Sequence, residues 1–232
     1  MPRPADRRAK TELLRAAEAV FVERGLAAAK VEDITGRAGV SKGAFYLHFE
    51  SKDDCWRQIV EAFLARMSGC LRIPDPKGMP TLEVICNQLD EWLAHDIEMF
   101  EFTWQNRALL GMLLAGGGGA PYGYLVDQFA EQVGRKLQAW AQMLIDAGIY
   151  RDDVDPALLT ALISGGYDRM AREVIKQSKR PDLASWCRQA QQFFLRASFT
   201  DEARAIIDRG VRSGLSPRAE AADLGQLAER SG

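Results

Sequence analysis

The residues of this chain whose types and spacing could do chemistry are concentrated in residues 31–49, which read VEDITGRAGVSKGAFYLHF. Apolar residues recur at helical spacing over 31–38, and Gly39 ends that short helix. Ser41 is placed to cap a second short helix over about 42–48. Two short helices joined by a tight turn containing glycine form a helix-turn-helix, whose second helix enters the major groove of DNA. The stretch therefore predicts DNA binding.

Individual side chains of this stretch fit contact with DNA. The cap at Ser41 leaves free backbone N–H groups pointing at a phosphate, and Lys42 is placed to reach a base edge or a phosphate. Gly43 allows a close approach of the backbone, because it has no side chain. Tyr46 and His48 offer polar groups to the sugar-phosphate backbone. The residues predicted to contact DNA are Lys30, Ser41, Lys42, Gly43, Ala44, Tyr46, Leu47, His48 and Lys52.

About fifty residues around this stretch resemble the TetR family of bacterial regulators. The matching residues are the amphipathic helix ending at Phe21–Gly25, then Val31, Ile34, Ala38-Gly39-Val40-Ser41-Lys42-Gly43, Phe45-Tyr46, His48-Phe49 and Ser51-Lys52. The resemblance implies an N-terminal three-helix DNA-binding domain and a C-terminal helical domain that binds an effector and forms a homodimer. Ala29, Lys30 and Ala44 depart from it, because the family usually has threonines there. A cap lost to alanine costs about 1 kcal/mol.

The composition is that of a folded protein that binds DNA through a local surface. Hydrophobic residues make up 47% of the chain and charged residues 27%, so it can bury a core, and the formal net charge is only −2. Residues 1–15, in contrast, carry five basic and two acidic side chains, a net +3. We find no signal peptide and no stretch of about 20 apolar residues, so we expect a cytoplasmic protein.

The remaining patterns predict helices and no strand, so the expected fold is all-α. Helical periodicity or capping residues indicate helices over 7–24, 31–38, 42–48, from Ser51, from Thr81, within 97–115 and 126–145, over 155–177 and over 182–205. Loops are expected at 73–80 and 116–119, where proline and glycine collect. The predicted organisation is a DNA-binding domain over 1–52, a ligand-binding and dimerisation domain over 53–210, and a polar tail over 211–232.

The middle of the chain is the predicted effector-binding region, since it is rich in aromatic residues and methionine. Such a lining suits a small apolar or aromatic molecule, oriented by a few polar groups. The candidate ligand-binding residues are Trp92, His95, Phe102, Trp104, Asn106, Arg107, Tyr124, Trp140, Tyr167 and Asp168.

The helices over 155–177 and 182–205 are the predicted dimer interface. Both are apolar on more than one face, and large aromatic residues are typical of interfaces. The candidates are Leu162, Gly165, Trp186, Ala190, Phe193 and Phe194. The alternative is that these side chains fill the core of the monomer. A two-fold dimer would bind a palindromic operator, with the recognition helices roughly 34–36 Å apart or somewhat more.

Three other functions are weighed against a ligand-responsive repressor. An enzyme lacks support, since the sequence has neither a catalytic constellation nor a phosphate-binding glycine loop after a strand. The four cysteines (Cys55, Cys70, Cys86, Cys187) are scattered, so we expect no metal and no cofactor. Cys55 lies beside the DNA-binding stretch and leaves open a thiol redox sensor, although a buried inert cysteine is commoner. A helical scaffold is the third alternative.

Overall fold

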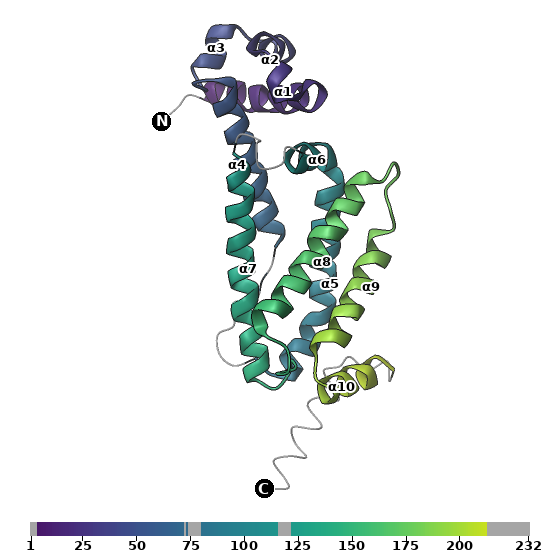
Figure 1. Cartoon of the computed structure of the whole chain (residues 1–232). Helices are drawn as coiled ribbons and strands as arrows, with labels where there is room; N and C mark the ends of the chain where they lie inside the picture. Colours follow the sequence, from purple (N-terminus) through teal and green to yellow (C-terminus); the bar gives the residue numbers. More distant parts are fainter. Residues whose placement is uncertain (1–3, 72, 74–79, 116–121, 213–232) are drawn as a thin grey trace. The chain divides into compact units, whose positions relative to one another are not determined.

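The computed structural model describes residues 4–71, 73, 80–115 and 122–212, and the predicted all-α class is confirmed over these residues (Figure 1). The described residues form ten helices and no strand. The helices are α1 Pro4–Ala28, α2 Val31–Ala38, α3 Lys42–Tyr46, α4 Lys52–Cys70, α5 Leu82–Gln105, α6 Arg107–Ala115, α7 Gly123–Asp146, α8 Pro156–Lys176, α9 Leu183–Ser198 and α10 Asp201–Arg212.

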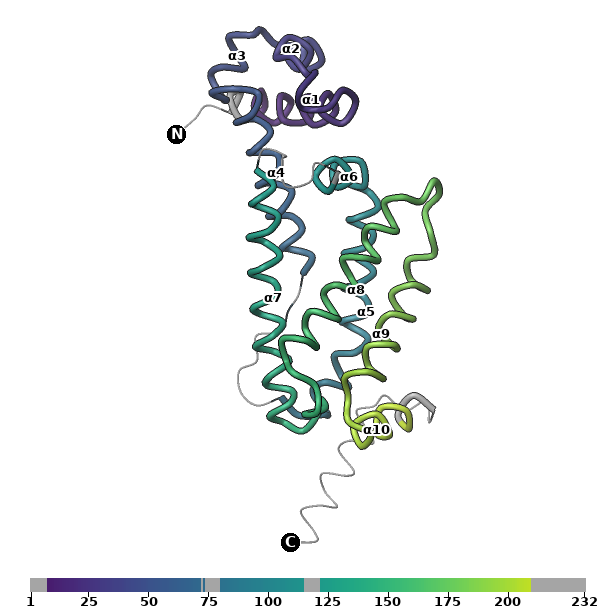
Figure 2. Tube along the Cα trace, in the orientation of Figure 1, coloured from purple at the N-terminus to yellow at the C-terminus, as the bar shows by residue number. Residues whose placement is uncertain are grey.

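The chain divides into two compact units. The first unit comprises Met1–Gly69 and Gln105–Phe129, and the second comprises Cys70–Trp104 and Ala130–Gly232. The first therefore holds α1 to α3, nearly all of α4, and α6, whereas the second holds α5, α8, α9, α10 and most of α7 (Figure 2). Over the described ranges, every helix falls short of the length or the apolar character that a membrane span requires.

Aromatic side chains form the core of the first unit. The rings of Phe21 on α1 and Trp56 on α4 meet edge to face, with their centroids 5.5 Å apart. Phe45 and Phe49 are also buried, and their rings lie 5.1 Å apart. The predicted helix break at Gly25 is confirmed, since its φ of 74° interrupts the helical conformation of α1.

The two short helices have the predicted arrangement. α2 has the predicted bounds, and Gly39 follows it in the left-handed conformation, with φ 68° and ψ 29°. Ser41 caps α3, as predicted, because its Oγ accepts a hydrogen bond from the backbone N–H of Ala44 at 3.2 Å. α3 is shorter than the predicted 42–48, since Leu47 ends it.

The second unit has two buried clusters between its helices. One cluster joins α5, α7 and α10, and includes Ile85, Leu144 and Phe199, which lies between α9 and α10. The other joins α5, α8 and α9 through Phe100, Val174, Leu183 and Cys187, in agreement with the side-by-side helices of Figures 1 and 2. The predicted start of α8 is confirmed, because the Asp155 carboxylate accepts hydrogen bonds from two N–H groups of its first turn.

The predicted single helix over 182–205 is wrong. α9 ends at Ser198, Phe199 is extended, and α10 begins at Asp201. The backbone of this break pairs with residues 149–151, where Arg151 N–H donates to Ser198 at 2.9 Å and Thr200 N–H donates to Ile149 at 3.0 Å. A tertiary contact therefore overrides the local helical periodicity.

Two further expectations concern the middle and the end of the chain. The apolar stretch 97–115 belongs to two helices, because α5 ends at Gln105 and α6 begins at Arg107. Most of the predicted loop over 73–80, the predicted turn over 116–119 and nearly all of the predicted tail lie outside the described residues.

Candidate DNA-binding surface and effector cavity

The helix-turn-helix presents its predicted DNA-contacting side chains at the surface while its aromatic residues Phe45 and Phe49 stay buried. Ser41, Lys42 and Gly43 are exposed at the start of α3. Tyr46 is 51% exposed and Leu47 80% exposed. A large apolar side chain exposed to that degree beside polar groups fits a surface that contacts a partner. Ala44 and His48 are half-buried.

Lys42 is held in an exposed ion pair. Its Nζ lies 2.5 Å from Glu32 Oε1 on α2, and this hydrogen bond lowers the pKa of Glu32 and raises the pKa of Lys42. Both side chains are more than half exposed, so water screens their attraction and the pair adds little to stability. A phosphate that approaches α3 can therefore compete with Glu32 for the ammonium.

Lys52 occupies a different environment from Lys42. Its Nζ donates to the backbone carbonyls of Leu26, Ala27 and Ala29 at 2.8, 3.0 and 3.0 Å. These carbonyls follow the break at Gly25, where a helix end leaves acceptors without intrahelical partners. The three ammonium N–H donors of Lys52 are thus used within the first unit, and its predicted phosphate contact stays a prediction.

Lys30 stands at the N-cap of α2 without a capping hydrogen bond from its own side chain. Asp33 supplies part of the missing cap, because its carboxylate accepts a hydrogen bond from the Lys30 backbone N–H at 3.1 Å. Asp33 also pairs with Arg24 of α1 at 2.9 Å. The Lys30 side chain is exposed and free of this capping role.

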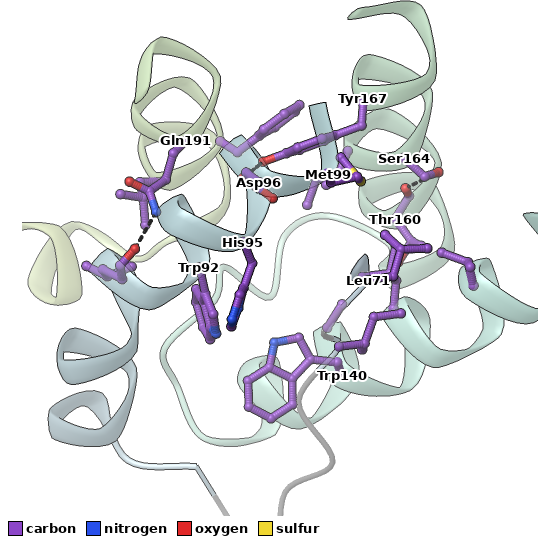
Figure 3. Close-up of a pocket in the computed structure, with 18 of the residues that line it drawn as sticks. Leu71, Trp92, His95, Asp96, Met99, Trp140, Thr160, Ser164, Tyr167 and Gln191 are labelled. Atoms are coloured by element: carbon purple, nitrogen blue, oxygen red, sulfur yellow. Dashed lines mark hydrogen bonds between the residues drawn. The ribbon is translucent and has the colours of Figure 1, made fainter. Parts of the chain in front are cut away.

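The second unit contains a cavity of about 290 Å³ (Figure 3). Its wall is mainly apolar and aromatic, with a few polar groups from α5, α8 and α9. The lining residues are Cys70, Leu71, Ile73, Leu89, Trp92, His95, Asp96, Met99, Val133, Leu137, Trp140, Ala141, Tyr150, Thr160, Ile163, Ser164, Tyr167, Gln191, Phe194, Leu195 and Phe199.

Four of the predicted ligand-binding residues line this cavity: Trp92, His95, Trp140 and Tyr167. The other six do not, and their part in ligand binding stays a prediction. Phe102 and Trp104 are half-buried on α5, Asn106, Arg107 and Tyr124 belong to the first unit, and Asp168 is exposed and bonded to Arg172 at 2.7 Å.

Sequence reasoning missed four polar residues of the cavity wall. Thr160 and Ser164 share a face of α8 with Tyr167 at i, i+4 and i+7, and Asp96 lies four residues after Trp92 on α5. That helical spacing could have identified these three. Gln191 had no such signal, since its place in the wall depends on how α9 packs beside α5, where its amide donates to the Leu89 carbonyl at 2.7 Å.

The polar groups of the cavity differ in what they can offer a ligand. The Tyr167 hydroxyl donates to Asp96 Oδ2 at 2.5 Å, and burial raises the pKa of Asp96 to about 6. Burial and the neighbouring Asp96 also raise the pKa of Tyr167 above its ordinary value. The hydroxyls of Thr160 and Ser164 donate to carbonyls of their own helix, each at 2.8 Å. They therefore face the cavity mainly as acceptors.

Residues 13–59, which run from α1 through the helix-turn-helix into α4, match the family described as "Bacterial regulatory proteins, tetR family". Residues 13–59 thus form a TetR-type DNA-binding region. The match covers the DNA-binding part that the sequence resemblance predicted.

Curated relatives match the same N-terminal part of the chain. The repressor KstR2 of Rhodococcus jostii is 43% identical over 63 residues, which are 27% of this chain and 31% of the relative. The transcriptional activator FasR of Mycolicibacterium smegmatis is 29% identical over 106 residues, 44% of this chain and 48% of the relative. The chain thus spans less than half the length of these curated relatives.

Solved structures share the fold over most of the chain. SmeT, described as the repressor of the Stenotrophomonas maltophilia multidrug efflux pump SmeDEF, has a TM-score of 0.64 and 21% identity. The alignment covers 84% of this chain and 92% of SmeT. The N-terminal helix-turn-helix and the helical C-terminal part predicted from the sequence are therefore the TetR fold.

α8 and α9 expose an apolar face. Leu162 is 59% exposed, Phe193 is 67% exposed, and Gly165 is also at the surface. Phe194 is half-buried and stacks on Tyr167, with ring centroids 5.5 Å apart, while half-buried Trp186 packs against the core cluster of α5, α8 and α9. Ala190 is half-buried as well. The predicted interface residues thus include both exposed side chains and side chains that pack within the monomer.

The cysteines and possible metal sites complete the description. Cys55 is fully buried, and burial raises the pKa of its thiol to about 12, whereas a reactive cysteine needs a lowered pKa. Within the described ranges, no group of three or more histidine, cysteine, aspartate or glutamate side chains is arranged to hold a metal ion.

Proposed function

We propose that this chain is a homodimeric transcriptional repressor that leaves a palindromic operator when a small apolar or aromatic effector binds. The observation that carries the proposal is the capped helix-turn-helix with exposed Lys42, Gly43 and Tyr46 on α3. At the start of a recognition helix, the exposed ammonium of Lys42 can bind a phosphate or a base edge, and Gly43 lets the backbone come close to the DNA because it has no side chain. The chemistry of the first unit thus supports binding of double-stranded DNA.

The cavity of the second unit supports regulation by a ligand. About 290 Å³ of mainly apolar space with a few directed polar groups suits a small molecule. A relative of the same fold, SmeT, is known as a complex with triclosan, and KstR2 of Mycobacterium tuberculosis is described as a ketosteroid regulator. A ligand that favours one conformation over another can change operator affinity by a coupling of about 1–3 kcal/mol.

The exposed face of α8 and α9 supports the dimer. Leu162 and Phe193 are large apolar side chains that water would otherwise cover, and a second copy of this face would bury them. We assign DNA binding to residues 1–52, effector binding and dimerisation to 53–210, and no role to the tail over 211–232. Operator binding requires access to the chromosome, so the proposed location is the cytoplasm, and no enzymatic activity or cofactor is proposed.

Selection of genomic fragments tests the proposal directly. Purified protein should enrich fragments that share an inverted repeat, and a small-molecule library should contain compounds that release them. If no fragment is enriched over bulk DNA, the proposal is overturned. The relatives include repressors and the activator FasR, so a reporter fused to the selected promoter determines the sign of regulation.

A pair of charge-removing variants tests the recognition helix. Lys42→Ala should weaken operator binding roughly tenfold to a hundredfold, since a contact to DNA is worth about 1–3 kcal/mol. Arg135→Ala is the matched control, because the Arg135 side chain is also more than half exposed and is paired with Glu131 on α7 of the second unit. Equal affinity of the two variants would favour a helical scaffold over a DNA-binding protein.

A further inference from the structure

The cavity holds a carboxylate, and the basic group beside it among the described wall residues is the neighbouring His95 rather than a lysine or an arginine. Asp96 lines the cavity from α5, and its hydrogen-bond donor in the structure is the neutral Tyr167 hydroxyl. Among the described lining residues there is no lysine and no arginine. A buried charge without a counter-charge is costly, so a folded protein retains one mainly where something else compensates it.

His95 gives the cavity a second acceptor. Its Nε2 lies 3.9 Å from Glu91 Oε1, and a neutral imidazole that directs its N–H toward this carboxylate has Nδ1 as its acceptor. Its Nδ1 is buried and has no hydrogen-bond partner in the structure. Nearly all buried polar atoms in proteins form hydrogen bonds. The unpaired Nδ1 of His95 is therefore a second indication that a ligand donates a hydrogen bond in this cavity.

Aromatic rings lie beside these two acceptors. In Figure 3 His95 lies next to Trp92 and points to the side of Trp140, while Asp96 lies toward Tyr167. The rings of Trp92 and Trp140 meet edge to face at 6.3 Å. Aromatic faces attract cations as well as apolar groups, so this wall is compatible with a positive charge.

We propose that the cavity binds a protonated amine carried on an apolar, aromatic body. The ammonium N–H groups donate to Asp96, the body packs among Trp92, Trp140 and Met99, and His95 Nδ1 accepts a further hydrogen bond. This inference rests on the proposed function and narrows its effector from any apolar molecule to a cationic one. Carboxylic acids are disfavoured, because they would place a second negative charge beside Asp96.

Calorimetric titration of the full chain with three probes of similar shape but different charge tests whether the cavity prefers a cation. At about pH 7.5, naphthylmethylamine is a cation, naphthylmethanol is neutral and naphthoate is an anion. The amine should bind at least about tenfold more tightly than the alcohol, as a charge-assisted hydrogen bond requires, and the anion should bind most weakly. Equal binding of amine and alcohol, no binding of the amine, or tightest binding of naphthoate overturns the inference.

A matched pair of variants tests whether Asp96 is the residue responsible for the preference for the amine. Asp96→Asn should remove the preference for the amine and leave binding of the alcohol unchanged. Asp153→Asn should bind all three probes as the natural sequence does, because Asp153 is exposed and paired with Arg151 outside the cavity wall. A preference that survives in Asp96→Asn contradicts the inference. The proposed function would fail separately, through the absence of any selected operator fragment.

The pH dependence provides a second measurement that needs no variant. The amine should lose about tenfold in affinity between about pH 7.5 and about pH 5, as Asp96 takes up its proton, whereas the alcohol should not. The titratable groups around Asp96 are His95 on α5, Tyr167 on α8 and Cys187 on α9. His95→Gln should keep the profile, which then belongs to Asp96. A flat profile for the amine in the natural sequence overturns the inference.

Discussion

Both units carry ion pairs at the surface, but the two units offer different charged groups to a partner. In the first unit, charges form ion pairs at the surface, such as Lys42 with Glu32 and Arg37 with Glu23 at 2.6 Å. In the second unit, Asp96 faces a cavity and has a neutral donor. Exposed ion pairs are weak, so a polyanion such as DNA can replace the acidic partner of the lysine or arginine. A carboxylate that faces a cavity can be reached only by a molecule that enters the cavity. The difference indicates which partner each unit can accept.

The largest expected effect concerns the exposed face of the second unit. Phe193→Asp should abolish the proposed dimer, because an interface anchor is worth at least about 2 kcal/mol and a two-fold interface contains it twice. Sedimentation of the variant should show a monomer that also binds the operator poorly. Val84→Asp is the control, since Val84 is 46% exposed and belongs to α5, which is not part of the proposed interface. A dimeric Phe193→Asp variant would contradict the proposed interface.

The buried carboxylate gives a prediction about pH and stability. The pKa of Asp96 is raised in the folded state from 3.8 to about 6, so its charge destabilises the fold above about pH 6. This cost falls as the pH drops toward the unfolded value, where both states hold the proton. Asp96→Asn should therefore raise the free energy of unfolding at about pH 7.5 by up to about 3 kcal/mol, and by little at about pH 4. Urea unfolding at both pH values measures this.

Asp96→Asn also sharpens the comparison between the units. A variant that is more stable but has lost the preference for amines would indicate a charge retained for binding. A variant less stable at about pH 7.5 than the natural sequence would show instead that Asp96 stabilises the second unit through Tyr167, and would remove the contrast with the surface pairs of the first unit.

Two lysines of the first unit should respond differently to the same change. Lys52→Met should lower the free energy of unfolding by about 2 kcal/mol, because three backbone carbonyls lose a charged donor. Lys42→Met should leave stability within about 0.5 kcal/mol, since its ion pair is exposed. Thermal unfolding of the two variants checks this. Equal stabilities would mean that Lys52 is not a structural residue.

Neighbouring glycines of α8 offer a smaller effect. A Cβ at residue 166 would lie 2.7 Å from Phe194 Cζ, whereas one at residue 165 would meet nothing within 4 Å. Gly166→Ala should cost about 1–2 kcal/mol, because it displaces the ring that stacks on Tyr167 and lines the cavity. Gly165→Ala should not destabilise the monomer, and any weakening of the dimer would indicate close approach there. Unfolding and sedimentation of both variants distinguish these outcomes.

The smallest expected effect concerns the cap of α2. Lys30→Thr should raise the free energy of unfolding by about 0.5–1 kcal/mol, because threonine can supply the capping oxygen that lysine lacks. The same variant removes an exposed charge, so operator affinity should fall more steeply with salt in the natural sequence than in the variant. An identical salt dependence would exclude Lys30 from contact with phosphate.

The sequence predicted the first unit better than the second. α2, its glycine stop and the Ser41 cap follow from residues within about ten positions of one another, and such local rules hold whatever surrounds them. For the cavity, the sequence predicted only that its wall would be rich in aromatic residues and methionine. Of its polar wall, His95 and Tyr167 were expected. Asp96 was overlooked although its spacing from Trp92 indicates it, and Gln191 had no local signal, because its position depends on how α9 packs beside α5.

Sequence alone therefore determined the helices, their stops and caps, and the type of DNA-binding motif, since backbone conformation responds to nearby side chains. Tertiary structure decided the break at Phe199, which pairing with residues 149–151 imposes. It also placed the two lysines in different environments: Lys42 lies at the surface, whereas Lys52 donates hydrogen bonds to the carbonyls that follow Gly25. Finally it gathered Trp92, Trp140 and Asp96 around one cavity, because burial and charge depend on which distant residues share a space.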